Sequence, residues 1–86
     1  MLIERLILEE LRRSPAHGYP LKGALERRGV RVVAGTMYGV LRRLERDGVL
    51  SGRWQDGRRR RVYRLTRLGE EVLRLRRLEL RSATRR

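Results

Sequence analysis

Apolar residues recur at intervals of three and four near the start of the chain, which predicts an amphipathic helix over residues 2–13. They stand at Ile3, Leu6, Ile7 and Leu11, and charged residues occupy much of the remainder. Ser14-Pro15 ends this helix, because proline disfavours helical backbone in the residue before it. A second helix is predicted over residues 17–28, where Pro20 falls in the tolerant first turn and Gly29 ends the helix.

A third helix follows a short β-branched stretch. Residues 30–33 lie between Gly29 and Gly35, so a brief strand or an extended link is expected there. Thr36 stands at a position typical of an N-cap, and Gly48 closes the helix. The apolar face comprises Met37, Val40, Leu41 and Leu44. Gly39 inside this helix costs up to ~1 kcal/mol relative to alanine, so it marks either a close approach to another backbone or a weak point.

Two strand-like runs flank Asp56-Gly57, a dipeptide suited to the positive φ angles of a two-residue hairpin turn. The outgoing strand is predicted over residues 50–55 and the returning strand over residues 58–65. Thr66 is predicted to cap a final helix. That helix has two apolar stripes, one made by Leu68, Val72, Leu75 and Leu78 and the other by Leu73 and Leu80. Two stripes imply two surfaces that need partners.

The charge of the chain is strongly positive and is unevenly distributed along the sequence. Its 86 residues carry 23 Lys plus Arg against 10 Asp plus Glu, a formal net charge of +13. Residues 31–66 hold 10 basic and 3 acidic groups, so the centre of the chain is its most positive part. Such a surface favours a polyanion, with the phosphate backbone of nucleic acid as the leading candidate. On charge alone, acidic protein tails and anionic lipids are also possible partners.

Several classes of protein are disfavoured by composition. There is no Cys and only one His, His17, so disulfides, thiolate chemistry and a usual zinc site are not expected. Without paired carboxylates in one motif, an enzyme is the least favoured interpretation, and no cofactor is expected. No apolar run approaches the ~20 residues that cross a bilayer, and the N-terminus does not resemble a signal peptide. We therefore expect a cytoplasmic protein with no membrane partner.

The order of elements is typical of a winged helix-turn-helix DNA-binding domain, mainly α with a small β-hairpin wing. We expect this domain over residues 1–66 and a C-terminal helix, a dimerisation element, over residues 67–86. The third helix would enter the major groove with the outward residues Gly39, Arg42, Arg43 and Arg46. Arg58, Arg59, Arg60 and Arg61 would contact phosphates or the minor groove. The alternative is that the outward face of the third helix and the arginine run of the hairpin are ordinary solvated surfaces with no partner.

Three motifs in order resemble the PadR family of transcriptional regulators. They are His17-Gly18-Tyr19, then Gly35-Thr36-Met37-Tyr38 with the run from Leu41 to Leu50, then Val62-Tyr63-Arg64-Leu65-Thr66 with Gly69. The resemblance implies a repressor that binds operator DNA as a homodimer. It also implies that the last helix, and often the first, forms the dimer interface. It also implies that Thr36, Met37 and Tyr38 open the recognition helix, and that Tyr38 touches the DNA backbone or braces the helix.

Two positions depart from that family, and other interpretations stay open. Gly39 stands where family members usually have proline, and the chain ends about twenty residues after Thr66, where many relatives continue. We expect His17 to be a helix-start residue, Tyr19 and Tyr63 to pack in or near the core, and Trp54 to pack on arginine stems or on the last helix. A winged helix that binds RNA, or a basic interaction module, is the alternative function. No effector is predicted.

Overall fold

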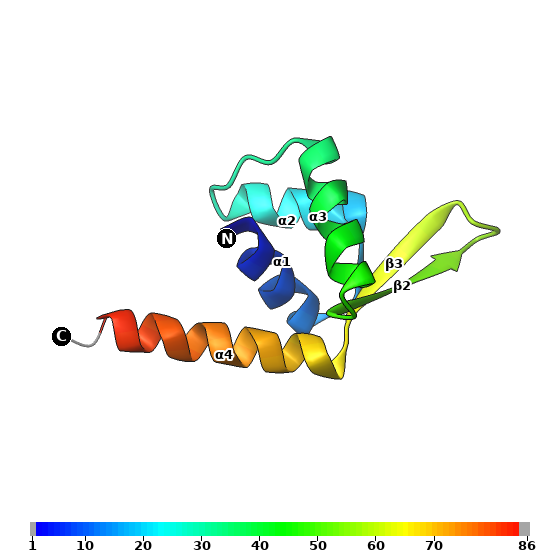
Figure 1. The fold of residues 1–86 in the computed structure, drawn as a ribbon. Coiled ribbons are helices and arrows are strands. Elements are labelled where there is room, and N and C mark those ends of the chain that lie inside the picture. The colour runs from blue at the N-terminus through cyan, green and yellow to red at the C-terminus, as the bar shows by residue number, and fades with distance from the viewer. Residues whose placement is uncertain (1, 85–86) are drawn as a thin grey trace.

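The computed structural model describes residues 2–84, and their side chains as far as residue 78. The elements follow the predicted order with one exchange of strands, as Figure 1 shows. They are α1 (Leu2–Arg13), β1 (Ala16–His17), α2 (Gly18–Arg27), α3 (Ala34–Arg46), β2 (Leu50–Gln55), β3 (Arg60–Leu65) and α4 (Arg67–Thr84). The predicted fold, mainly α with a β-hairpin wing and a C-terminal helix, is confirmed. The predicted apolar position Leu80 lies outside the described side chains, and residues 85–86 lie outside the described chain.

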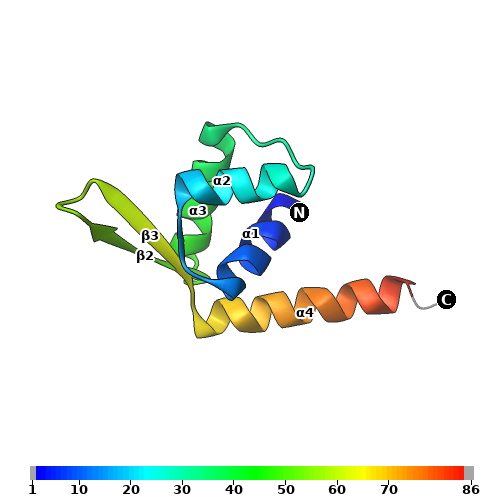
Figure 2. The same cartoon turned by 180° about the vertical axis from the view of Figure 1, so that it is seen from behind.

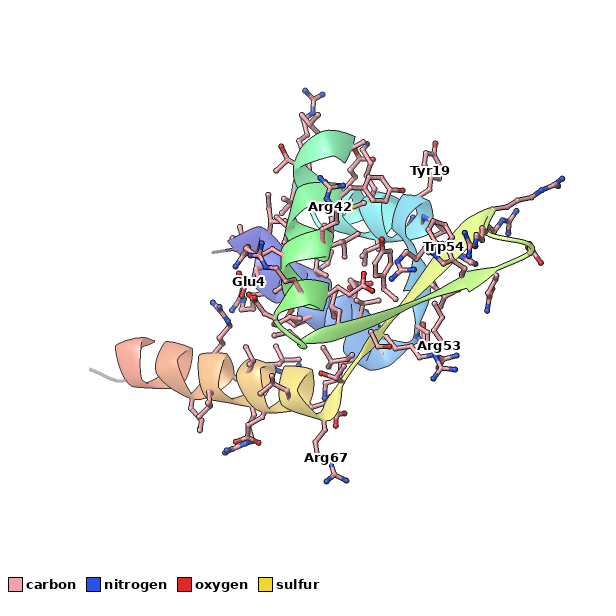
Figure 3. All side chains as sticks on the ribbon, turned by 45° about the vertical axis from the view of Figure 1, so that its right-hand side comes forward. Glu4, Tyr19, Arg42, Arg53, Trp54 and Arg67 are labelled. Carbon is pink, nitrogen blue, oxygen red and sulfur yellow. The ribbon has the colours of Figure 1, made fainter. Side chains whose placement is uncertain are left out.

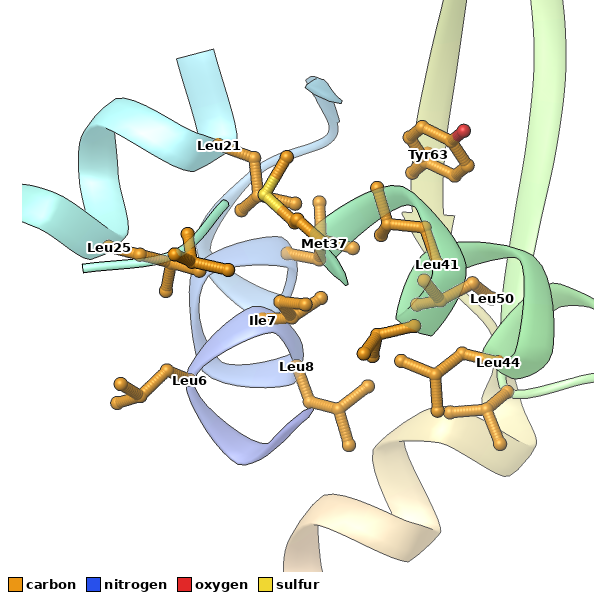
Figure 4. Packing of buried hydrophobic residues seen from close by; sticks show 14 of the residues in the cluster. Leu6, Ile7, Leu8, Leu21, Leu25, Met37, Leu41, Leu44, Leu50 and Tyr63 are labelled. Atoms are coloured by element: carbon orange, nitrogen blue, oxygen red, sulfur yellow. The ribbon is translucent and has the colours of Figure 1, made fainter. Parts of the chain in front are cut away.

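The core lies between the helices and the base of the hairpin, with α1 at its centre (Figures 1 and 4). Nine large side chains are essentially inaccessible to solvent: Ile7, Leu8, Leu21, Leu25, Met37, Leu41, Leu44, Leu50 and Leu73. Leu8 is not among the predicted apolar positions of the first helix. It is buried because α1 packs against α2, β3 and α4, which cover more than one side of the helix. Burial of such a side chain contributes about 1.5–3 kcal/mol.

Glycines end the two central helices, as predicted. Gly29 has φ +85° and Gly48 has φ +79°, a conformation that L side chains rarely adopt. The predicted N-cap of the third helix is wrong by three residues. Val33 takes the N-cap position with extended backbone, and its carbonyl oxygen accepts a hydrogen bond from the Met37 N–H at 3.0 Å. Thr36 therefore lies inside the first turn, exposed, and does not cap the helix.

The short strand is not where the sequence pattern placed it. Residues 30–33 form no strand, and Val32 packs in the core instead. Ala16 and His17 form β1, which pairs antiparallel with β3 opposite Tyr63 and Val62 and gives the sheet the order β1-β3-β2. A strand exists only where another strand offers a free edge. The segment after α1 reaches that edge, whereas residues 30–33 link α2 to α3 far from the sheet (Figure 2).

The hairpin turn is longer than predicted. Gln55 pairs with Arg60, so four residues, not two, connect β2 and β3. Asp56 and Gly57 have positive φ, at 52° and 62°, as their residue types suggest. Arg58 follows with φ 72°, which is incompatible with an extended strand. The returning strand therefore begins at Arg60, and Arg58 and Arg59 belong to the tip of the wing.

Thr66 caps α4, as predicted. Its Oγ1 accepts a hydrogen bond from the Gly69 N–H at 3.0 Å and lies 2.6 Å from the Gly48 carbonyl oxygen, to which the hydroxyl donates. Leu73 fixes α4 to the core, whereas Leu68, Leu75 and Leu78 are 44–51% exposed. The helix runs past α1 and away from the wing (Figures 1 and 2). Among the described residues, no helix combines the length and apolarity needed to cross a bilayer.

Candidate nucleic-acid interface

One side of α3 faces away from the core. At 100° per residue, Gly35, Gly39, Arg42 and Arg46 fall on a single stripe opposite the buried leucines. Beyond the chain neighbours and the adjacent backbone of α3 itself, a Cβ built on either glycine meets no atom within 4 Å. The Arg42 side chain is exposed on α3 (Figure 3). The stripe therefore offers bare backbone in its first half and guanidinium groups in its second half.

Arg43 does not belong to this exposed stripe, contrary to the sequence-based expectation. Its guanidinium bonds the Glu4 carboxylate of α1 at 2.8 Å, and Arg76 of α4 bonds the other carboxylate oxygen at 2.5 Å. The Glu4 side chain is only 8% exposed. The hydrogen bond to Glu4 raises the pKa of Arg43 above its ordinary value. Arg43 lies on the flank of α3 that meets α1, where it ties three helices together.

Thr36, Met37 and Tyr38, which the family resemblance placed at the opening of the recognition helix, have different environments. Met37 is fully buried in the core, so it cannot contact a ligand outside the domain. Thr36 is exposed. Tyr38 is half-buried, and its ring lies over Gly18 so closely that a Cβ on Gly18 would stand 2.5 Å from the ring. Gly18 thus accommodates the ring of Tyr38, which explains why a glycine stands at the start of α2.

Three of the four wing arginines are exposed, and the fourth is not free. Arg61 is half-buried, hydrogen-bonds Glu45 of α3, and lies with its guanidinium 5.1 Å from the centre of the Trp54 ring. It reaches Glu45 across Gly52, where a Cβ would stand 2.6 Å from its Nε. Trp54 packs on an arginine, as predicted. Arg61 therefore ties the wing to α3 and leaves Arg58, Arg59 and Arg60 at the exposed tip.

A cleft of about 520 Å³ lies between the start of α2, α3 and the wing. Its lining includes every aromatic residue of the chain: Tyr19, Tyr38, Tyr63 and Trp54. Tyr63 is buried at its floor, and burial raises the pKa of the Tyr63 phenol. The expectation that Tyr19 packs is wrong, since it is 81% exposed at the rim. Figure 3 shows Tyr19 and Trp54 on facing elements of this cleft.

Two features of this surface are absent from the sequence-based prediction. Gly35 completes the α3 stripe, and its spacing of four from Gly39 is a signal available in the sequence. The gathering of the aromatic residues has no such local signal. Tyr19 and Trp54 are brought together only because β1 pairs with β3 and sets the start of α2 beside the wing.

Known proteins share both the sequence and this architecture. The transcriptional regulator Rv3488 of Mycobacterium tuberculosis is 46% identical over 69 residues, which are 78% of this chain and 64% of that protein. A PadR family regulator from Eggerthella lenta superposes with TM-score 0.85 at 36% identity, covering 93% of this chain and 72% of that one. One from Clostridium difficile superposes with TM-score 0.89 at 28% identity, covering 96% and 91%.

The family comparison agrees with these likenesses. The model of the PadR-like family of transcriptional regulators matches residues 7–75, which run from α1 to the third turn of α4 and include the exposed stripe of α3 and the whole wing. Since that match spans most of the chain and the fold agrees with it, this chain belongs to the PadR-like family of transcriptional regulators.

Proposed function

We propose that this chain is a sequence-specific regulator that binds double-stranded DNA as a homodimer and represses transcription from an inverted-repeat operator in the cytoplasm. The observation that carries the proposal is the exposed stripe of α3, where two glycines precede Arg42 and Arg46, beside a wing tip rich in arginine. Family membership supports DNA-binding regulation. Repression and the homodimer are the finer parts of the proposal.

In this proposal α3 enters the major groove. Gly35 and Gly39 let the backbone of the first turns approach the base edges, and Arg42 and Arg46 donate to guanine or to phosphate. Arg46 lies 3.6 Å from Asp47, but the side chains are 74% and 49% exposed, so the pair is weak enough for DNA to replace it. Arg43, already bound to Glu4, has a structural role and takes no part.

The wing supplies the second contact. Arg58, Arg59 and Arg60 are exposed at the tip, and no ion pair within the described part of the chain involves them. Phosphates flanking the α3 site would neutralise them with release of counterions. The bond from Arg61 to Glu45 holds the wing at a fixed angle to α3, so both contacts form together.

A second copy of the chain is proposed to cover the apolar side of α4. Leu68, Leu75 and Leu78 stay 44–51% exposed along a helix that extends beyond the body of the domain. Two-fold pairing there would place two α3 helices in successive major grooves about 34–36 Å apart. A dimer bound to the operator in this way would cover promoter DNA. Sedimentation of the free protein and of its DNA complex tests the stoichiometry.

The central experiment is titration of selected duplexes at several salt concentrations. Arg42→Ala is expected to lower the affinity for the preferred duplex roughly 5- to 150-fold and to relax the base preference at one position of the operator. Replacing Arg58, Arg59 and Arg60 by alanine is expected to lower the affinity for duplexes of every sequence. The slope of log K against log salt concentration is expected to fall by about 0.9 for each phosphate that the wing no longer neutralises. Arg67→Ala is the control, since Arg67 is exposed on the side away from α3 and the wing (Figure 3).

The same titration separates the proposal from its alternative. Unchanged duplex affinity in both the Arg42 and the wing variants would contradict the assignment of this surface. Preference for RNA at matched salt would instead favour an RNA-binding winged helix.

A further inference from the structure

The aromatic residues of this chain are few, and two of them, Tyr19 and Trp54, lie outside the core. Only four of 86 residues are aromatic, and all four line the cleft between α2, α3 and the wing. Tyr19 is 81% exposed and Trp54 is 54% exposed, on opposite elements of that cleft. Both rings stay more than half exposed, although Arg61 lies over the Trp54 ring, so they offer apolar surface for stacking. The arrangement fits a ligand that carries a flat ring or a sugar face.

The same cleft is also rich in unused hydrogen-bond donors. Arg59 and Arg60 line it, and neither has a carboxylate partner within the described residues. The N-terminus of α2, a helix of ten residues, opens at its edge without a side-chain cap. Guanidinium groups bind phosphate through paired donors, and helix N-termini attract anions. Two guanidiniums and a helix end suit a phosphate ester better than a single carboxylate.

One polar atom in the lining lacks a partner. The Nδ1 atom of His17 is inaccessible to solvent and forms no hydrogen bond. An unsatisfied polar atom of this kind is unfavourable, and because solvent does not reach it, a ligand group in the cleft reaches it only if the His17 ring turns. His17 is the N-cap residue of α2, so its ring lies beside the helix end that would hold the phosphate.

We propose that this cleft is a nucleotide site, in which the base or sugar packs against Tyr19 and Trp54 and the phosphate is held by Arg59, Arg60 and the start of α2. Its volume of about 520 Å³ falls within the range of small-ligand sites. A free nucleotide and an unstacked nucleotide of a DNA strand present the same chemistry to it. If duplex DNA occupies α3 and the wing, as proposed above, a free nucleotide in this cleft competes with it directly. That last step rests on the proposed function, whereas the binding itself does not.

Trp54, the only tryptophan, reports on the cleft through its fluorescence. The test titrates the intact chain with deoxyadenosine monophosphate, with deoxyadenosine and with inorganic phosphate. Saturable quenching is expected with the nucleotide, at an affinity roughly tenfold or more above that of the nucleoside or of phosphate, because stacking and charge act together. Equal affinity for nucleotide and inorganic phosphate would overturn the proposal.

Variants at the rim sharpen the result. Tyr19→Ala is expected to lower the affinity for the nucleotide roughly tenfold. Tyr19→Phe is expected to preserve that affinity, because the ring face supplies the contact. Tyr19 is so exposed that neither change disturbs the core. Arg67→Ala, a distant charge removal, is expected to leave the affinity unchanged. Equal nucleotide affinity in the Tyr19→Ala variant and the unmodified chain would also overturn the proposal.

A further pair of titrations identifies the source of the nucleotide. Quenching by the free nucleotide together with loss of bound duplex indicates a competing small ligand, and quenching by a single-stranded oligonucleotide alone indicates a strand contact; both support the site. Quenching by neither refutes it. A chain that binds duplex but no nucleotide in either form refutes this site and leaves the proposed function standing. A chain that binds nucleotide but no duplex refutes the proposed function alone.

Discussion

The carboxylate of Glu4 is the feature on which we base our most detailed prediction. Glu4 is 6% exposed, and no other charged residue among the described side chains is so deeply buried. It accepts hydrogen bonds from Arg43 of α3 at 2.8 Å and from Arg76 of α4 at 2.5 Å. Glu4→Gln keeps the size of the side chain and removes its charge. The two guanidiniums then face each other across a neutral amide.

The size of the effect follows from burial. Removing one member of a fully buried ion pair costs about 3–5 kcal/mol. Because the Arg43 and Arg76 side chains are 39% and 33% exposed, water screens part of that loss. We therefore expect Glu4→Gln to lower the free energy of unfolding by about 2 kcal/mol. For a domain of this size, that corresponds to a fall in Tm of roughly 8–16 °C.

Urea denaturation followed by circular dichroism measures this difference directly. Glu71→Gln is the matched control, because Glu71 also bonds an arginine, Arg74, but its side chain is 52% exposed. Its pKa is lowered by the hydrogen bond from Arg74, yet the pair lies in solvent and its loss is expected to leave Tm nearly unchanged. If the Glu4 variant is as stable as the Glu71 variant, the argument from burial is wrong.

Three further substitutions test the packing and the capping of the helices. Gly69→Ala is expected to destabilise the domain by at least about 1 kcal/mol, because its Cβ would overlap the carbonyl oxygen of Val49, whereas Gly39→Ala, with no atom nearby, is expected to stabilise it by up to about 1 kcal/mol. Thermal melts of the two variants check the opposite signs. Thr66→Val is expected to cost about 1–2 kcal/mol through loss of the α4 cap, and urea titration would disprove this if the midpoint did not fall.

Most of the helical framework could be predicted from the sequence, because its signals are local. The apolar spacing along α3, and the glycines at 29 and 48, act within one or two turns. Thr66 is recognisable as a cap for the same reason, since its partner is three residues away. At the site, the exposed positions Arg42 and Arg46 and the half-buried Gly39 follow from the same periodicity.

The remainder depends on contacts between distant segments. Arg43 sits on the flank of α3, and only the packing of α1 and α4 decides that it shares the Glu4 carboxylate, 39 positions away, with Arg76. β1 exists because β3 offers an edge 45 or more residues later. The exposure of Tyr19 follows from that pairing. Such outcomes are set by tertiary structure, which overrides local propensity.

The Thr66 cap has a mechanical consequence. One hydroxyl joins the end of the α3 segment, through the Gly48 carbonyl, to the first turn of α4, through the Gly69 N–H. Because α4 has 18 residues and is about 27 Å long, a tilt of about 10° at this joint displaces its far end by about 5 Å. In the proposed dimer α4 acts as a lever arm, so the stiffness of the Thr66 joint determines how much variation in operator spacing the protein tolerates.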